Sequence, residues 1–282
     1  MGYNSGRTIV ITFQLVIQSK AGKQAPSLLR HLRECGIVKW EDLTKANLND
    51  FRDHVTERVA SSSARTYFAV LKAILKRYED DMDFCKDYAS ILKAKNEKPI
   101  KTFLTMKELE RLEQVEVKSE IEQYVLDEFL IGAYTGMRIS DAREVSEENM
   151  ANGYLSYVSI KTGIHAVVPL KPGVAERIKR VQASDVTVSL MGYNKAIRRL
   201  VQRAGITERV KVFKAGERLA GEKWEYVSSH TARHSFCTNL AIMGAPLHQI
   251  SMLAGHTSVA MTDRYIIKTM PELSSKTLKF FQ

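Results

Sequence analysis

The stretch from Lys93 to Thr102 constrains this chain most, because it is charged, contains one proline and has few side chains to bury. Such a composition is typical of a linker between domains. Just after it, Thr105 and Glu108 have the spacing of a capping box, which predicts the start of a new helix. The chain of 282 residues leaves enough length for two separate cores. We therefore expect two domains, residues 1–103, with a linker at about 93–103, and residues 104–282.

The region before the linker is expected to be helical. Apolar residues at helical spacing predict one helix between Pro26 and Gly36, a second after Thr44, and a third after the serines at 61–63. Ahead of them, the apolar stretch Ile9–Ile17 is too short for a membrane span. Its β-branched residues fit either a strand or a segment packed on this domain.

The third of these helices has two distinct faces. Six apolar side chains form one stripe: Tyr67, Val70, Leu71, Ile74, Leu75 and Tyr78. At about 100° per residue, Arg65, Lys72 and Lys76 fall together on the opposite side. This basic face suits contacts with a DNA phosphate backbone, although an ordinary solvated lysine face has the same pattern.

The second domain combines helices with a small hairpin. A buried helix is indicated by Ile121, Val125, Leu126, Phe129, Leu130 and Ala133. It leads to a turn at Gly136, after which Ser140 is expected to cap the next helix. Residues 154–160 and 166–170 alternate as strands around a Thr162-Gly163 turn, and a further helix is expected from Pro246 to Ala254. The chain is therefore predicted to be mainly α with a small antiparallel β-sheet.

Charge and cysteine usage narrow the function classes. Forty-two Lys and Arg against 32 Asp and Glu leave a formal charge of +10, which favours a polyanionic partner. The three cysteines, Cys35, Cys85 and Cys237, are odd in number and widely spaced, so they support neither a disulfide framework nor a zinc ribbon. We expect a cytoplasmic protein without a membrane anchor.

Two segments near the C-terminal end concentrate chemically active side chains. Ser229 to Phe236 includes His230 and Arg233, which share a helix face because they are three residues apart. The second segment carries His256 and, nine residues later, Tyr265. His234 points away from the face of His230 and Arg233, so a structural role suits it better.

A metal site is the rival interpretation of these histidines. His230 and His234 have a spacing that permits zinc ligation, with His256 as a third nitrogen. The metalloprotease pattern requires Glu directly after the first histidine, but Thr231 stands there, and no carboxylate base is nearby. We expect no metal and no other cofactor.

Further candidates lie upstream. Arg138 follows the Gly136 turn, and Asp141 lies in the first turn of the helix after it. Lys161 is placed at the tip of the predicted hairpin, and Lys171 at the far end of the second strand is the competing lysine.

The order Arg138, Lys161, His230-x-x-Arg233, His256, Tyr265 resembles that of the tyrosine recombinase, or phage integrase, family. The motifs cover roughly residues 104 to 270 and the resemblance extends more loosely to the helical region before them. It implies a helical core-binding domain and a mixed α+β catalytic domain that close around duplex DNA. It also implies that Asp141 supports the site and that the Lys161 hairpin enters the minor groove.

The chemistry of DNA cleavage gives each residue type a role. Arg138 and Arg233 can grip the non-bridging phosphate oxygens and stay charged. A phenol has a pKa near 10, so Tyr265 needs a base, for which His230 is the candidate, with His256 as a further donor to the phosphate. Lys161 is the candidate acid for the 5′ hydroxyl that leaves, while Tyr265 holds the 3′ phosphate covalently.

The expected partner is a double-stranded DNA recombination site. We expect a free monomer and, as the resemblance implies, a tetramer on paired sites. The apolar tail, with Leu273, Leu278, Phe280 and Phe281, is expected either to fold back on its own domain or to insert into a neighbouring protomer. A type IB topoisomerase and a non-catalytic DNA-binding protein on the same scaffold remain the alternatives.

Overall fold

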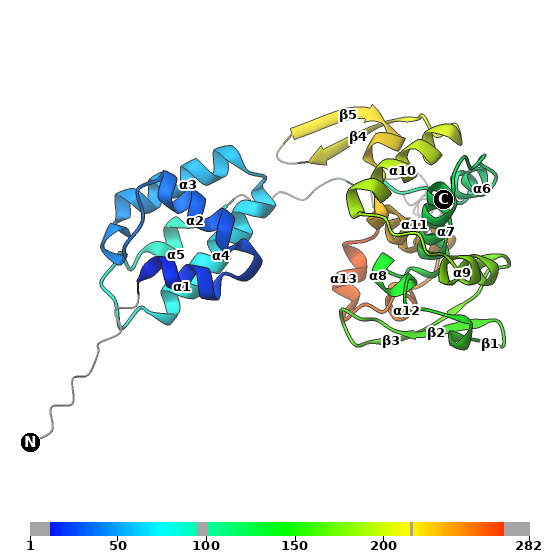
Figure 1. Cartoon of the computed structure of the whole chain (residues 1–282), viewed down its shortest axis with the longest axis horizontal. Helices are drawn as coiled ribbons and strands as arrows, with labels where there is room; N and C mark the ends of the chain where they lie inside the picture. Colours follow the sequence, from blue (N-terminus) through cyan, green and yellow to red (C-terminus); the bar gives the residue numbers. More distant parts are fainter. Residues whose placement is uncertain (1–11, 95–100, 215–216, 268–282) are drawn as a thin grey trace, which may run out of the picture. The chain divides into compact units, whose positions relative to one another are not determined.

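The computed structural model describes residues 12–94, 101–214 and 217–267, and these form two compact units (Figure 1). The first unit holds helices α1 to α5, and the second holds helices α6 to α13 with a three-stranded sheet. The predicted fold class, mainly α with a small antiparallel sheet, is confirmed. None of the helices in the described part of the chain is long and apolar enough to cross a membrane.

The first unit is a helical cluster around an aromatic core. Its helices are α1 (Phe13–Lys20), α2 (Ala25–Glu34), α3 (Lys45–Arg58), α4 (Ser61–Arg77) and the short α5 (Tyr88–Ile91). Trp40 lies at the centre, with its ring 5.0 Å from that of Phe13 and 5.8 Å from that of Phe84. These rings are buried together with aliphatic side chains such as Leu28 and Leu71, and burial of this apolar surface stabilises the unit.

Local sequence signals explain where these helices begin and end. Pro26 lies in the first turn of α2, and Gly36, just beyond its end, has a φ of 73° that favours glycine. The Thr44 hydroxyl accepts a hydrogen bond from the Asn47 amide and so caps α3. The helix α4 begins at Ser61, so the serines lie inside its first turn and do not precede it as caps.

The N-terminal apolar stretch is helical where it is described. Residues 13–17 belong to α1, in which Phe13, Val16 and Ile17 are buried in the core of the first unit. Residues 9–11 lie outside the described residues. Of the two interpretations left open, the packed segment is correct for residues 13–17.

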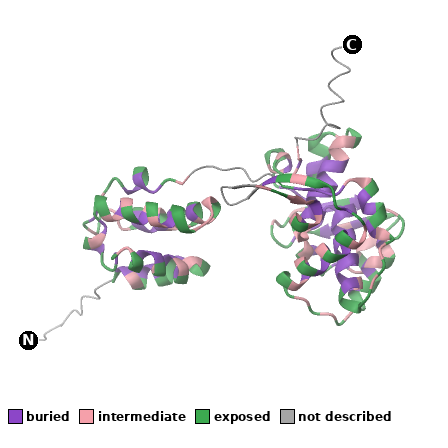
Figure 2. Ribbon diagram, turned by 90° about the horizontal axis from the view of Figure 1, so that it is seen from above, coloured by how far each residue is buried: buried purple, intermediate pink, exposed green. Residues whose placement is uncertain are grey.

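The second unit is built around one buried helix, α7 (Glu120–Thr135). It packs against α9 (Val174–Gln182), α10 (Leu190–Arg203) and α11 (Ser229–Met243), and α6 (Met106–Glu113) precedes it. The capping box predicted for Thr105 and Glu108 is present at the start of α6. Figure 2 shows the buried residues concentrated inside this unit. Ile121 was expected in the core but is 48% exposed, because it lies in the first turn of α7, which reaches the surface.

The three-stranded sheet positions the predicted lysine. Its strands are β1 (Met150–Ala151), β2 (Tyr154–Val158) and β3 (His165–Pro169), in the order β1-β2-β3, and neighbouring strands are antiparallel. Alternation buries Leu155 and Tyr157 on one face and leaves Val158 exposed on the other. The β2–β3 connection therefore projects from a fixed hairpin, and it carries Lys161.

The remaining elements complete the second unit. Strands β4 (Arg209–Lys214) and β5 (Glu217–Glu222) form a two-stranded sheet after α10. The short helices α8 (Ile139–Ala142), α12 (Leu247–Leu253) and α13 (Val259–Asp263) carry the segments singled out in the sequence. The apolar tail from Leu273 onward lies outside the described residues.

Candidate active site

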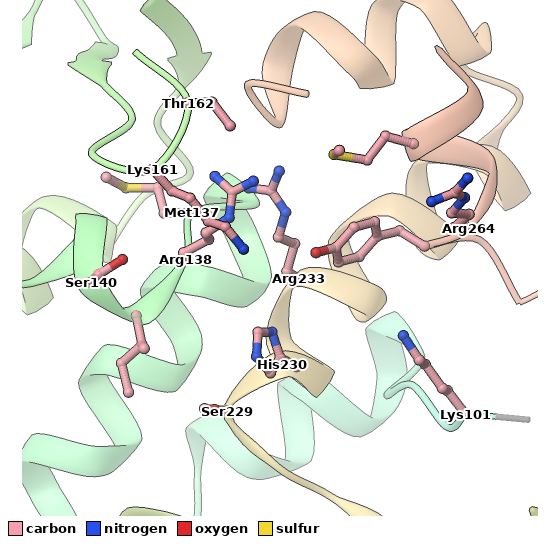
Figure 3. A pocket seen from close by; sticks show the side chains of 13 residues that line it. Lys101, Met137, Arg138, Ser140, Lys161, Thr162, Ser229, His230, Arg233 and Arg264 are labelled. Atoms are coloured by element: carbon pink, nitrogen blue, oxygen red, sulfur yellow. The ribbon is translucent and has the colours of Figure 1, made fainter. Parts of the chain in front are cut away.

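One pocket of the second unit gathers most of the predicted site residues (Figure 3). Its volume is about 410 Å³. Five of the six predicted catalytic residues line it: Arg138, Lys161, His230, Arg233 and Tyr265. The sixth, His256, is buried directly behind the tyrosine. Residues up to 127 positions apart in the sequence thus meet at one place.

The turn after α7 is shaped by a glycine. Gly136 has a φ of 74°, and a Cβ at this position would come within 2.5 Å of the Phe236 ring on α11. Glycine is therefore required both for the backbone conformation and for the close approach of α11. The turn brings Arg138 to the start of α8, where it lies at the pocket wall.

A buried carboxylate holds Arg138 and the lysine hairpin together. The guanidinium of Arg138 donates to the Ser159 hydroxyl at 2.8 Å, and Ser159 donates to Asp141 at 3.1 Å. The other oxygen of Asp141 accepts from the Ile160 amide at 3.1 Å. Asp141 lies in the first turn of α8, as expected, but α8 already begins at Ile139, so Ser140 is inside the helix and does not cap it.

Arg233 is the most buried cation of the pocket. It is 1% exposed, and its Nη1 donates to the Gly136 carbonyl at 2.6 Å. Its Nε and Nη2 have no hydrogen-bond partner among the described residues. Burial lowers its pKa, and the nearby Arg138 lowers it further. Two unpaired donors on a buried guanidinium indicate a place for an anion, because such donors cost free energy when left unsatisfied.

His230 lies one helical turn from Arg233 and faces the same pocket (Figure 3). Desolvation lowers its pKa, and the charges of Lys101 and Arg233 lower it further. The imidazole is therefore neutral near pH 7, with a nitrogen lone pair available to accept a proton.

The Tyr265 ring is held between two imidazoles. The ring centres of His234 and His256 each lie 4.7 Å from the centre of the Tyr265 ring, and each ring is tilted by about 30° from it. His234 Nδ1 lies 2.9 Å from the Tyr265 carbonyl, so it carries the proton and donates to that oxygen. The Arg233 guanidinium carbon lies 5.2 Å from the centre of the tyrosine ring. These contacts confine the tyrosine at the pocket and match the structural role expected for His234.

His256 is buried, and one of its nitrogens is already engaged. Its Nδ1 lies 2.8 Å from the Thr262 hydroxyl, while Nε2 has no partner among the described residues. Burial and the charges of Arg233 and Arg138 hold its pKa at about 3. A neutral imidazole that accepts from Thr262 at Nδ1 carries its proton on Nε2, as a donor to phosphate requires.

The structure separates the two candidate lysines. Lys161 lines the pocket. Lys171 instead donates to Glu113 at 3.2 Å and lies 4.0 Å from the centre of the Tyr134 ring, and it is not part of the pocket lining. The geometry therefore favours Lys161 as the lysine of the site.

Two cations that line the pocket were not predicted from the sequence. Lys101 and Arg264 both line it, and the Lys101 ammonium lies 5.8 Å from the centre of the Tyr265 ring. Desolvation of this ammonium lowers the pKa of Lys101, although much of the side chain is exposed. Lys101 had been counted as part of a linker, where neither periodicity nor spacing distinguishes one lysine from another.

The other predicted groups lie outside this pocket. Arg65, Lys72 and Lys76 are on α4 of the first unit, with Arg65 and Lys76 exposed and Lys72 half-buried. Lys76 forms an ion pair with Glu79. Two of the imidazoles considered as zinc ligands have different hydrogen-bond partners. His234 contacts the Tyr265 carbonyl, and His256 contacts the Thr262 hydroxyl.

Comparisons with known proteins show which family the chain resembles. The model of the phage integrase family matches residues 102–272. A curated relative, tyrosine recombinase XerC of Natranaerobius thermophilus, is 24% identical over 250 residues, which are 81% of this chain and 80% of the relative.

Solved structures share the fold. A lambda integrase dimer bound to a core site has a TM-score of 0.65 at 15% identity, covering 90% of this chain and 92% of that chain. A lambda integrase tetramer bound to a Holliday junction has a TM-score of 0.65 at 14% identity, covering 92% of this chain and 79% of that chain.

The family model and the recombinase relatives identify the chain as an enzyme that cleaves and rejoins DNA. Its pocket combines a phenol, two guanidiniums, an imidazole and a lysine. The match over more than half of its length shows that the chain belongs to the phage integrase family, the tyrosine recombinases.

Proposed function

We propose that the protein is a site-specific recombinase that breaks and reseals DNA through a 3′-phosphotyrosyl intermediate at Tyr265. One observation carries this proposal: Tyr265 lies in the same pocket as Arg138, Arg233 and His230 and is held there by contacts from α11 of its own chain. The two unpaired donors of Arg233 support a phosphate position beside the phenol.

The proposed reaction is a transesterification. The Tyr265 oxygen attacks the scissile phosphorus as His230 accepts the phenolic proton. The bond between phosphorus and the 5′ oxygen breaks, and Lys161 gives a proton to that oxygen. Arg138, Arg233 and the Nε2–H of His256 stabilise the charge on the non-bridging oxygens. A 5′ hydroxyl from another strand then reverses these steps, and because the phosphodiester bond energy is retained, neither ATP nor a metal is needed.

The domain roles and the assembly belong to the same proposal. Within residues 1–103, the part before the linker at about 93–103 would form a core-binding domain, and Arg65, Lys72 and Lys76 on α4 would contact the phosphate backbone. Residues 104–282 would form the catalytic domain. The free protein would be a monomer that forms a tetramer on paired sites.

Trapping on a suicide substrate tests the central step. Its nick lets a short fragment diffuse away after cleavage, so covalent protein–DNA adduct accumulates. We expect wild-type protein to form the adduct and Tyr265→Phe, which lacks only the hydroxyl, to bind DNA but form none. Tyr124→Phe is the matched control, since Tyr124 is also a buried tyrosine but donates to Glu128 at 3.1 Å and does not line the pocket.

The outcomes separate the alternatives. Adduct at wild-type yield from Tyr265→Phe would exclude this tyrosine as the nucleophile. Absence of adduct from the wild-type protein on a substrate that it binds would support a non-catalytic DNA-binding protein. Strand exchange between two duplexes separates a recombinase from a topoisomerase, which relaxes supercoils without exchanging partners.

A further inference from the structure

A group of potential metal ligands lies in the first unit, on α2 and α3, and includes none of the residues proposed for DNA cleavage or DNA binding. His31 and Glu34 are three residues apart on α2 and therefore share a helix face, and His54 on α3 faces them. Together with Arg30, Arg58 and Val59 they line a surface cleft. His31 is buried, His54 is partly buried and Glu34 reaches the opening of the cleft.

Three atoms of this group converge closely. His31 Nδ1 lies 3.2 Å from His54 Nε2, His54 Nε2 lies 2.9 Å from a Glu34 oxygen, and that oxygen lies 3.5 Å from His31 Nδ1. Ligands placed tetrahedrally at about 2.0–2.1 Å from a zinc ion are about 3.3 Å apart. The three observed distances between the candidate ligand atoms, 2.9, 3.2 and 3.5 Å, are therefore close to the spacing that zinc requires.

Among the described residues, the nitrogens of His31 and His54 cannot all have a suitable hydrogen-bond partner at once. Arg58 Nη1 lies 2.8 Å from His54 Nδ1, and since a guanidinium only donates, the proton of a neutral His54 is on Nε2. This proton can donate to Glu34. If His31 Nδ1 is protonated as well, two N–H groups face each other; if it is not, its proton is on Nε2, which is buried without a partner among the described residues.

We propose that His31, Glu34 and His54 form a binding site for a divalent transition-metal ion of the zinc type. Two imidazole nitrogens and one carboxylate oxygen are a ligand set that zinc accepts, and the open cleft admits water as the fourth ligand. Bound there, the ion joins α2 to α3 and stabilises the first unit by binding only its folded form.

Arg58 opposes the ion in the arrangement observed. When a metal occupies Nε2 of His54, the proton moves to Nδ1, and the guanidinium that now donates to Nδ1 must turn away. The side chain is exposed, so it has room to turn. A carboxylate at position 58 would instead accept the Nδ1 proton and orient the ring, as outer partners of metal-bound histidines do.

Calorimetric titration of the chelator-treated full chain with Zn²⁺ tests the site, with thermal unfolding measured in parallel. We expect one ion per chain and a higher unfolding midpoint. Glu34→Gln and His54→Gln should each weaken binding by about tenfold or more, whereas Arg58→Glu should tighten it, by up to about tenfold. His248→Gln is the control, because His248 is exposed on α12 of the second unit.

Each result decides the question. Unchanged affinity in both Glu34→Gln and His54→Gln, or no binding by the wild-type chain, would overturn the proposal. Weaker binding in Arg58→Glu would also contradict it, since that outcome means the arginine does not compete with the ion. Circular dichroism confirms that each variant is folded, and Glu34 and Arg58 are exposed enough for their variants to remain so.

Discussion

Replacing Arg233 by alanine separates catalysis from stability. The guanidinium is 1% exposed and donates to the Gly136 carbonyl, and its Nε and Nη2 have no partner within the described part of the chain, so they could bind a phosphate. Losing one donor that stabilises transition-state charge reduces the rate by about 10²–10³. We therefore expect Arg233→Ala to form covalent adduct at least about 10²-fold more slowly than the wild-type protein at saturating DNA.

The effect of the same change on folding should be small, because two contributions oppose each other. Loss of the bond leaves the Gly136 carbonyl unsatisfied, which costs about 1–3 kcal/mol. Removal of the charge relieves the desolvation that lowers the pKa of Arg233 in the folded protein. We expect the free energy of unfolding, measured in urea, to change by no more than about 1–2 kcal/mol.

Arg177→Ala is the matched control. Arg177 is also mostly buried, at 14% exposed, and donates to Asp127 at 2.7 Å, but it does not line the pocket. Its removal should lower stability, because Asp127 is buried, and leave the rate of adduct formation unchanged. Similar rates for the two variants, or a loss in Arg233→Ala confined to DNA affinity, would refute the catalytic role.

Three further predictions concern protons and charge. Lys161→Ala should cleave normal DNA poorly but recover on a substrate with sulfur at the bridging 5′ position, because a thiolate leaves without protonation; recovery in Lys171→Ala alone would reverse the assignment. Lys101→Met should slow adduct formation by about tenfold, the effect of about 1.4 kcal/mol of lost charge stabilisation, and Lys101→Arg should restore most of it. Burial holds the pKa of His234 at about 4 and that of His256 at about 3, below the ordinary 6.5, so the unfolded chain binds more protons in this range. The free energy of unfolding should therefore fall as the pH drops from 6.5 toward 4, and a flat profile would contradict the buried neutral imidazoles.

Strong local signals made much of the fold predictable. Pro26, Thr44 and the Thr105–Glu108 capping box mark helix ends through their own backbone chemistry, and the structure has helices there. The prediction that Ser140 caps a helix was wrong, because a serine can lie in the first turn of a helix as readily as before it. The prediction that Ile121 is buried was wrong, because helical periodicity does not show how far a helix extends beyond the core.

Those parts of the candidate site that depend on the spacing of residues along the chain could be predicted from the sequence. The pairing of His230 with Arg233 follows from the helical repeat, and the pocket contains both. Ser159 joins Arg138 to Asp141, and Lys101 reaches the pocket from the segment before α6. Both placements depend on tertiary contacts that no local sequence pattern shows. Nor did the sequence bring His31 and His54 together, since they are on different helices.

The hydrogen bond from His234 to the Tyr265 carbonyl bears on whether each protomer cleaves DNA with its own tyrosine or with that of a neighbour. The helix α11 carries His230, Arg233 and His234, that is, the proposed base, one proposed phosphate ligand and this anchor, so the proposed nucleophile is attached to the pocket of its own chain. If these residues act as proposed, each protomer contains a complete catalytic centre. In a mixed assembly, we therefore expect no rescue between a subunit defective at Arg233 and a neighbour that lacks only the phenol, because the tyrosine of the first stays bound to its own defective pocket and does not reach the intact pocket of the second.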